Sequence, residues 1–470
     1  DPGVFLRQAD LRTTPDSRIV FSVLDGGALL GDYAAAFWGL GTGDDVRYVK
    51  RFWEIATLGD VWIRHQGAVA QTLPYSGREH VLRWEGGSGA LSHEPGAFIR
   101  GTDIWGRKGV SVSQTGELRC TLYEGTSWNQ NCAPVIPHND DDLAAVWAFL
   151  SSDAFHLEVR KIDQSLKVTN ATLVKVPFDI VHWRQVAADR YPDGLAARSS
   201  DDPTQWLFQG RPETSTEPLQ VAAGRLLGYR WPEQPESDDL DELADDDGIV
   251  CLPSVLGERS AADRLQELLS RAFGGTWSPA RTRELLATSG SKKRDLQSWL
   301  RDDYFKANCQ VFKNRPVVWQ VWDGRKDGFS ALVNYHRLDR KALERLTYTY
   351  LGDWIERQAA GVRDDVPGAE ERLAAARDLQ RRLELILEGE PPYDIYVRWK
   401  SLAEQPMGWD PDLNDGVRLN VRPFVEAQVL RSKFNVKWDK DRGKNSDGSE
   451  RINDRHATLA EKQAARGGTR

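Results

Sequence analysis

Between Phe98 and Phe178 the hydrophobic pattern along the chain changes its period twice. GVSVSQ, ELRCTLYEG and NCAPVIP are short β-branched runs separated by turn-forming glycines, which is typical of β-strands. DDLAAVWAFLSS then follows helical spacing, with acidic residues at its start and four apolar residues on one face: Leu143, Val146, Trp147 and Leu150. TLVKVPF alternates again and predicts a strand that ends at Pro177. This stretch therefore predicts a sheet with packed helices that can hold several loops rigidly against a long ligand.

Upstream, residues 17–24 and 31–38 have the composition of buried strands, and residues 60–97 are rich in glycine and predict long surface loops. The run Gly39-Leu40-Gly41-Thr42-Gly43-Asp44 resembles a loop that binds a nucleotide or S-adenosylmethionine, because only glycine lets the backbone come so close to a ligand. No convincing second strand with a terminal acidic residue follows about 20 residues later, as a ribose-binding carboxylate would require. A tight turn that packs against Trp53 is the other interpretation.

Downstream, the pattern predicts helices at 180–189, in PLQVAAGRLLGYRW, from Ser260, from Ser278-Pro279 to about Gly290, and at 293–308. Ser260 and Asp263 fit a capping box, before a stripe of Ala261, Leu265, Leu268, Leu269 and Phe273. VVWQVW and FSALVNY predict a hairpin, and 339–360 and 367–388 predict an antiparallel helix pair. His336 has no identifiable catalytic partner and is predicted to be a hydrogen-bonded structural residue.

These elements indicate an α+β protein with six parts. We expect lead-in strands and the glycine-rich turn at 1–60, a β-rich recognition domain with packed helices at 61–232 and a solvated acidic linker at 233–250. A helical spacer at 251–310, a hairpin with antiparallel helices at 311–436 and a charged flexible tail at 437–470 complete the chain. The last 40 residues have eleven basic and six acidic residues and are predicted to be extended or disordered, or to contact DNA.

Composition limits the class of protein. The 470 residues include four cysteines, at 120, 132, 251 and 309, without CxxC spacing, which indicates neither a zinc site nor a disulfide framework and fits a reducing cytoplasm. No apolar run approaches the roughly 18 residues of a membrane span. The chain begins at Asp1 and contains only Met407, so the sequence predicts a fragment or a processed product.

The distribution of charge is more informative than its sum. The net charge is −8, but residues 236–247 alone contain eight acidic and no basic residues, so the remainder is neutral. Residues 100–119 contain four basic and two acidic residues, and residues 160–175 contain four and one. A basic stripe on a near-neutral body is a footprint for DNA, or else a solvated face.

Several segments carry a resemblance to a known family. GLGTGDDVRYVKRFWE, WGRKGVSVSQ, NCAPVIP, LAAVWAFLSSDAF, VRKIDQSLKVTNATLVKVPF, QWLFQGRP, QVAAGRLLGYRWP and VWQVWDGRKDGFSALVNYHRLD look like parts of large bacterial class I adenine-specific DNA methyltransferases. These enzymes occur in fused type II restriction–modification, bacteriophage-exclusion and DISARM defence systems. The likeness covers the target recognition domain and the C-terminal region that follow the methylase. The family's cofactor loop and Asn-Pro-Pro-Tyr motif are not found, and Glu390-Pro391-Pro392-Tyr393 is interpreted as a helix stop.

The resemblance implies a module that recognises double-stranded DNA, with no cofactor of its own, for an S-adenosylmethionine-dependent catalytic domain outside this chain, and with other defence proteins as further partners. Phosphate contacts position such a module and contacts to base edges give specificity. Arg107 and Lys108 lie in a glycine-flanked turn, and Gln114 can pair bidentately with adenine. The predicted DNA-binding residues are Arg107, Lys108, Ser113, Gln114, Arg119, Lys167, Thr169, Asn170 and Thr172. Thr42 and Asp44 resemble a family element that precedes the recognition domain.

Two other classes remain open on the sequence. The first is a self-sufficient methyltransferase that uses Gly39 to Gly43 for its cofactor. The second is an extracellular carbohydrate-binding protein that uses some of the 18 tryptophans as stacking platforms. Against the second, five tryptophans fall within apolar patterns and are predicted to be core: Trp38, Trp53, Trp147, Trp299 and Trp319.

Overall fold

The computed structural model describes residues 27–432, the single residues 436, 438, 444 and 448, and residues 456–467. The strand predicted at 17–24 lies outside the described residues. The chain forms two compact units. Unit 1 comprises residues up to Phe52, 57–200 and 205–207, and unit 2 comprises 53–56, 201–204 and the chain from Phe208 onward. Helices and antiparallel sheets occur together, which confirms the α+β class.

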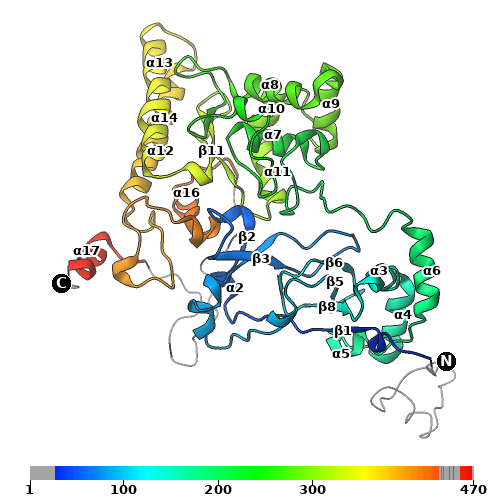
Figure 1. Cartoon of the computed structure of the whole chain (residues 1–470). Helices are drawn as coiled ribbons and strands as arrows, with labels where there is room; N and C mark the ends of the chain where they lie inside the picture. The colour runs from blue at the N-terminus through cyan, green and yellow to red at the C-terminus, as the bar shows by residue number, and fades with distance from the viewer. Residues whose placement is uncertain are drawn as a thin grey trace, which may run out of the picture. The chain divides into compact units, whose positions relative to one another are not determined.

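The central sheet of unit 1 has four antiparallel strands in the order β1-β8-β5-β6. They are β1 (Ala34–Ala36), β8 (Cys132–Pro137), β5 (Gly109–Ser113) and β6 (Cys120–Tyr123). Every residue of β5, β6 and β8 is buried, as the apolar runs in the sequence indicated. Four helices gather beside this sheet in Figure 1: α3 (Leu143–Leu150), α4 (Asp153–Ile162), α5 (Asn170–Leu173) and α6 (Ile180–Arg190). Their apolar residues and those of the strands form one hydrophobic core.

Two parts of the predicted fold of unit 1 are wrong. TLVKVPF is not a strand, because Thr169 caps the short helix α5 and only Pro177 makes an isolated bridge, to Leu29. Residues 60–97 are not only loops, since β3 (Trp62–Gln66) and β4 (His80–Arg83) join β2 (Val49–Arg51) and β7 (Ser127–Trp128) in a second sheet. Leu82 of β4 packs with Leu40, Leu91 and Tyr48 of α2 (Asp45–Tyr48) in a small core, with Val49 of β2 and Ile63 of β3 against it.

Unit 2 contains a three-stranded sheet in the order β10-β11-β9. The hairpin of β10 (Val318–Trp322) and β11 (Ser330–Asn334) is as predicted, and β9 (Ile249–Cys251) pairs with β11. The helices are α7 (Pro218–Leu226), α8 (Ala261–Phe273), α9 (Pro279–Thr288), α10 (Leu296–Asp302) and α11 (Tyr304–Val311). The cap and buried stripe of α8 match the sequence prediction residue for residue. The predicted helix at 293–308 is instead two helices that meet at Asp303.

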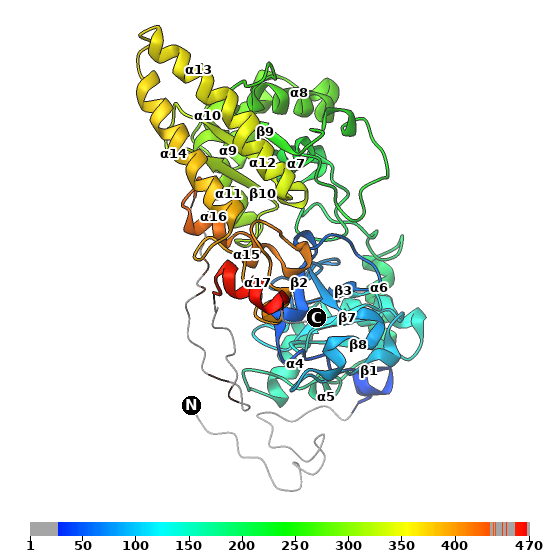
Figure 2. The same cartoon turned by 90° about the vertical axis from the view of Figure 1, so that its left-hand side faces the viewer.

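The predicted helix pair is present and Figure 2 shows its members side by side. The first member is α12 (Arg340–Glu344), a π-helical stretch (Arg345–Tyr350) and α13 (Leu351–Arg363), and the second is α14 (Ala369–Glu388). Gly389, with a φ of 72°, ends α14, and Glu390 to Tyr393 form the turn after it, in agreement with a helix stop. The chain continues through α15 (Val417–Asn420) and α16 (Arg422–Glu426).

The acidic segment 233–250 is not a solvated linker. Arg225 of α7 binds Asp238 and Asp241 at 2.5 and 2.9 Å, Arg264 of α8 binds Asp245 at 2.8 Å, and the segment ends in β9. Basic residues far away in the sequence neutralise its charge, so it packs within unit 2. The contacts therefore divide the chain near residues 200–208 and join the predicted spacer and hairpin parts into one unit.

The C-terminal tail is described only in part. Residues 459–467 form a helix, α17 (Leu459–Gly467), in which Lys462 is fully buried, whereas an extended or disordered tail was predicted. The rest of the predicted tail lies mainly outside the described residues.

Candidate nucleic-acid interface

The loops at one end of the β1-β8-β5-β6 sheet come together, although they are far apart in the sequence. We define this sheet-end surface as residues 37–41, 114–119, 129–131 and 163–170. Residues 37–41 follow β1, residues 114–119 follow β5, and residues 129–131 precede β8. Antiparallel pairing brings these three strand ends to the same end of the sheet. The fourth segment links α4 to α5 and contacts residues 114–119 and 129–131.

Gln114 holds this surface together. Its backbone N–H donates to Asn131 O at 3.0 Å, and its carbonyl accepts from Val168 N–H at 2.9 Å. Its side-chain Nε2 donates to Val168 O at 3.0 Å, and the residue is buried. The side chain is thus used inside the fold, whereas the sequence predicted it to read an adenine.

Lys167 and Thr169 are presented outward on either side of the buried Val168. The Lys167 ammonium donates to Gln130 O and to Asn131 Oδ1, both at 3.1 Å, yet the residue stays exposed. Thr169 is exposed and caps α5 by accepting from Thr172 N–H. Asn170 is half-buried and donates to Ala36 O at 3.0 Å, which ties α5 to the end of β1.

The structure separates the remaining predicted residues into three groups. Arg119 is half-buried at the same end of the sheet and forms an ion pair with Glu117. Ser113 and Thr172 are buried, and the Ser113 hydroxyl bonds Val69 N and O. Arg107 and Lys108 are exposed but precede β5, at the opposite end of the strand from Ser113. An extended strand rises about 3.4 Å per residue and six steps separate Lys108 from Gln114, so the two cations lie roughly 20 Å along the strand from the start of the sheet-end surface.

Sequence reasoning missed an aromatic feature next to this surface. Trp38 was predicted to be core but is 47% exposed, and the Arg100 guanidinium lies 4.5 Å from its ring centroid. Phe98 meets the Trp38 ring edge-on at 6.3 Å. One signal in the sequence could have indicated this exposure. Trp38 comes just after the short run Ala34–Ala36 and directly before glycines, which end strands. The other four tryptophans predicted to be core are buried.

The glycine-rich run is closed by protein atoms. A Cβ on Gly39 would overlap the backbone carbonyl of Asn129, and one on Gly41 would overlap the Phe98 ring. Gly41 and Phe98 exchange backbone hydrogen bonds of 3.1 and 2.8 Å. Thr42 Oγ1 donates to Asp45 Oδ1, and Asp44 caps α2. The glycines therefore permit close packing between loops, so the space beside Gly39 and Gly41 is filled by protein and not by a cofactor.

The two cysteines of unit 1 are not activated as nucleophiles. Burial raises the pKa of Cys120 to about 12 and that of Cys132 to about 11, so both stay as thiols at neutral pH. In unit 2, burial lowers the pKa of His336, and its Nε2 lies 2.8 Å from Trp53 O, in agreement with the predicted structural role. Among the described residues no group of three or more His, Cys, Asp or Glu side chains could hold a metal ion.

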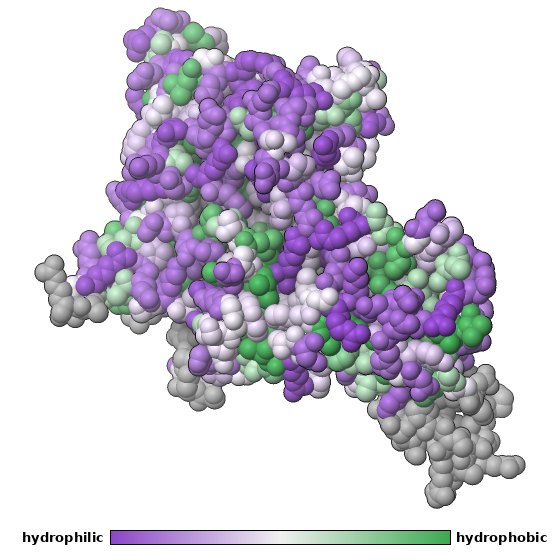
Figure 3. Space-filling model, in the orientation of Figure 1, coloured by the Kyte–Doolittle hydropathy of each residue, from purple (hydrophilic) through white to green (hydrophobic). Residues whose placement is uncertain are grey.

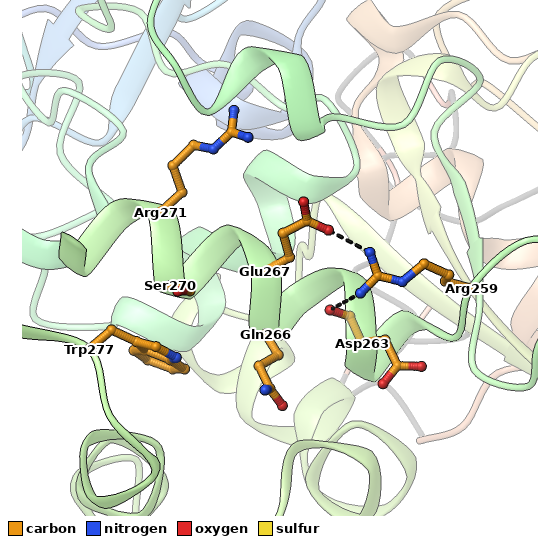
Figure 4. Close-up of a pocket in the computed structure, with 7 residues that line it drawn as sticks. All are labelled: Arg259, Asp263, Gln266, Glu267, Ser270, Arg271 and Trp277. Carbon is orange, nitrogen blue, oxygen red and sulfur yellow. Dashed lines mark hydrogen bonds and ion pairs between the residues drawn. The ribbon is translucent and has the colours of Figure 1, made fainter. Parts of the chain in front are cut away.

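Polar hollows also occur outside this surface. Figure 4 shows one of about 540 Å³ on α8 in unit 2, with Trp277 on one side and charged residues on the other. Arg259 binds Glu267 at 2.6 Å and the Asp263 carbonyl at 3.3 Å across it. Arg271 is paired with Glu242 at 2.9 Å. Its charges are thus neutralised by one another, and the hollow has no free cation directed at a ligand.

Figure 3 shows mainly hydrophilic residues with separate hydrophobic patches on the face in view. Within the described part of the chain, no helix is both long and apolar enough to cross a membrane.

Comparison with known proteins connects this chain to one class of enzyme. About a quarter of it is similar to adenine-specific methyltransferases. It is 30% identical over 122 residues to the adenine-specific methyltransferase PglX of Lacticaseibacillus casei (strain Zhang). It is 26% identical over 135 residues to the adenine-specific methyltransferase BrxX of Escherichia coli O9:H4 (strain HS). The chain spans only about a tenth of the length of these curated relatives, 10% and 11% respectively. No protein-family model matches it.

Proposed function

We propose that this chain is the DNA-recognition part of an adenine-N6 DNA methyltransferase that acts in restriction–modification or phage defence. Unit 1 grips double-stranded DNA and reads its sequence, and a catalytic domain outside this chain transfers the methyl group. The parent enzyme uses S-adenosylmethionine, and this chain contributes no cofactor site of its own. Its further partners are other proteins of the defence system.

The sheet-end surface is the observation that carries the proposal. It presents Lys167 and Thr169 outward and the half-buried Asn170 beside them, on loops tied to buried strands and helices. Amide and hydroxyl groups on a rigid support are suited to base edges, and the lysine is suited to phosphate. The similarity to adenine-specific methyltransferases supports DNA as the ligand.

Arg107 and Lys108 have a separate role in this proposal. They are exposed at the other end of β5, and Arg107 Nη2 donates to Pro137 O at 2.9 Å, which holds the guanidinium on the end of β8. A B-form duplex of ten base pairs is already about 34 Å long, against roughly 20 Å between the two ends of the strand, so one duplex can contact both ends of the sheet. We assign phosphate positioning to these two cations and base reading to the sheet-end surface.

Adenine-N6 methylation requires that the target base leave the helix and enter a catalytic pocket. The chain's part in this step is to hold the duplex in register while the catalytic domain receives the base. The filled space around Gly39 and Gly41 agrees with this division, because it leaves methyl transfer to the other domain.

A binding titration of this chain against randomised duplexes at two salt concentrations, with S-adenosylmethionine tested alongside, examines the proposal. We expect selective enrichment of one duplex sequence, affinity that falls with salt, and no calorimetric heat with S-adenosylmethionine. Binding that is equal for all sequences would contradict a recognition role. Binding of S-adenosylmethionine would favour the self-sufficient methyltransferase instead.

A further inference from the structure

The tip of the segment between α4 and α5 carries the most exposed large apolar side chain among the residues that the structure describes. Leu166 is 83% exposed. Isolated exposed leucines are common on soluble proteins, so exposure alone assigns no role. The way in which this loop is held, and what lies beside it, distinguish Leu166 from the others.

The loop around Leu166 is fixed from both sides. Before the tip, Arg160 of α4 donates to Asp163 O, Ser165 O and Gly116 O at 3.3, 2.7 and 2.6 Å. Ser165 N–H donates to Asp163 Oδ1 at 2.8 Å, and Ser165 Oγ donates across the tip to Lys167 O at 3.0 Å.

After the tip, the chain is held equally firmly. Lys167 forms an antiparallel bridge with Thr115, and Val168 is fully buried with both backbone groups bonded to Gln114. A loop restrained in this way loses little conformational entropy when its tip binds. The fold therefore presents an apolar side chain on a rigid support, directed into solvent.

The neighbours of Leu166 are suited to a polyanion with an apolar interior. Lys167 follows it and is exposed, and the one carboxylate in the loop, Asp163, is engaged by Ser165. Proteins that bend or open DNA insert Leu, Ile, Phe, Met or Pro side chains between base pairs, with cations on the adjoining phosphates. We propose that Leu166 is such a wedge, which enters the base stack of the duplex while Lys167 contacts the backbone. This inference rests on the proposed function and adds a mechanical step to it.

A wedge has a consequence that an ordinary surface contact lacks. Inserting the side chain costs the stacking of one base step, and this cost is smaller where a base is already missing. The chain should thus bind more tightly when a single abasic site lies at the step that Leu166 enters. Moving the abasic site elsewhere should weaken binding or leave it unchanged.

The test uses the full 470-residue chain and the duplex selected from the randomised pool. Affinity is measured for a set of duplexes with one abasic site at each position in turn, for the wild type and for Leu166→Ala. We expect one position at which the abasic site strengthens wild-type binding about tenfold, and loss of that maximum in Leu166→Ala. Leu157→Ala is the matched control, because Leu157 is 60% exposed on α4 of the same unit. It should retain the maximum.

The outcomes separate the two proposals. If the wild type selects a duplex but shows no position of strengthening, or if Leu166→Ala keeps it, Leu166 is not a wedge and DNA recognition stands. If Leu166→Ala binds every duplex as the wild type does, the leucine contacts another protein or nothing at all, and the wedge is again wrong. If no duplex is selected by the wild type, the proposed function fails and the wedge fails with it.

Discussion

At the scale of single residues, several polar side chains that were predicted to contact DNA are buried, and they stabilise the loops around the sheet-end surface instead. Gln114, Ser113 and Thr172 are buried: Gln114 donates to Val168 O, Ser113 donates to Val69 O, and the Thr172 hydroxyl bonds the hydroxyl of Thr169. Lys167, Thr169 and Asn170 remain available at the surface or at its edge. We therefore expect substitutions in the two groups to have different effects.

Gln114→Ala should lower stability. It removes the donor to Val168 O and leaves a buried carbonyl unpaired, which costs about 1–3 kcal/mol. Urea unfolding should show an earlier midpoint, whereas Gln164→Ala, at an exposed position in the neighbouring loop, should not. Unchanged stability together with an altered base preference would show instead that Gln114 contacts a base, as the sequence predicted.

Asn170→Ala should relax base preference at one position of the selected duplex. A well-placed amide contributes about 1–3 kcal/mol of discrimination against the wrong base. The measurement is repeat selection from the randomised pool with the variant. Because Asn170 also donates to Ala36 O, the unfolding midpoint must be measured as well. A loss of stability with the same preferred sequence would show that the residue is only structural.

His65 should make the stability of unit 1 depend on pH. Burial lowers its pKa to about 4, and its Nδ1 lies 3.0 Å from Ser127 Oγ. Between this value and the ordinary histidine pKa of about 6.5, the unfolded chain binds one more proton than the folded chain. The free energy of unfolding should therefore fall by roughly 2 kcal/mol from pH 7 to pH 5. In His65→Gln the decrease should be smaller by about that amount, and in His182→Ala, at an exposed position, it should not change.

At the scale of elements, capping and burial explain why some segments match their sequence patterns and others do not. The capping residue and apolar stripe of α8 are contained in fourteen consecutive residues, from Ser260 to Phe273, so local chemistry determines them. TLVKVPF has the alternation of a strand, but Thr169 caps a short helix that includes its first two residues. The backbone N–H groups of Gly31 and Leu30 donate to Val174 O and Val176 O, which holds the rest of the segment as an irregular edge. Here tertiary contacts outweigh propensity.

Helix α17 is held on unit 2 by a buried ion pair. Lys462 Nζ donates to Asp394 Oδ2 at 3.1 Å and to Pro406 O at 3.2 Å, and both charged side chains are fully buried. Burial raises the pKa of Asp394, but bonds and charges from His456 and Lys462 outweigh this, so the pKa is lowered. The stabilisation is therefore complete above the ordinary aspartate pKa of about 4 and is lost only as the pH falls through the lowered pKa.

Lys462→Ala should release α17. Removing one partner leaves a buried charge uncompensated, at a cost of about 3–5 kcal/mol, so amide hydrogens of residues 459–467 should exchange at least a hundredfold faster. Hydrogen exchange followed by mass spectrometry measures this at pH 7. Gln463→Ala changes an exposed neighbour on the same helix and should leave exchange almost unchanged. Equal exchange in the wild type and Lys462→Ala would show that the ion pair does not hold the helix.

At the scale of the whole molecule, the charge distribution matters more than the net charge of −8. Much of the acidic charge lies in residues 236–247, where arginines of unit 2 neutralise part of it. The nine residues predicted individually to bind DNA all lie in unit 1. DNA binding should therefore be a property of one unit and not of the average surface.

Paired charge reversals test this division. Lys108→Glu with Lys167→Glu should weaken duplex binding by at least a hundredfold and reduce the slope of log affinity against log salt by about two or more. Lys326→Glu with Lys341→Glu places the same charge change on exposed lysines of unit 2 and should have a small effect. Equal effects of the two pairs would show that affinity follows net charge alone.

The sequence by itself determined the α+β class, the helix pair, the hairpin and the α8 cap, because each depends on residues that are close together in the chain. It also indicated the similarity to adenine-specific methyltransferases through short motifs. Only the tertiary structure decided which residues reach the surface. The burial of Gln114, the exposure of Trp38, the packing of the acidic segment and the placement of Lys108 and Lys167 at opposite ends of β5 all depend on contacts between distant segments, which no local pattern specifies.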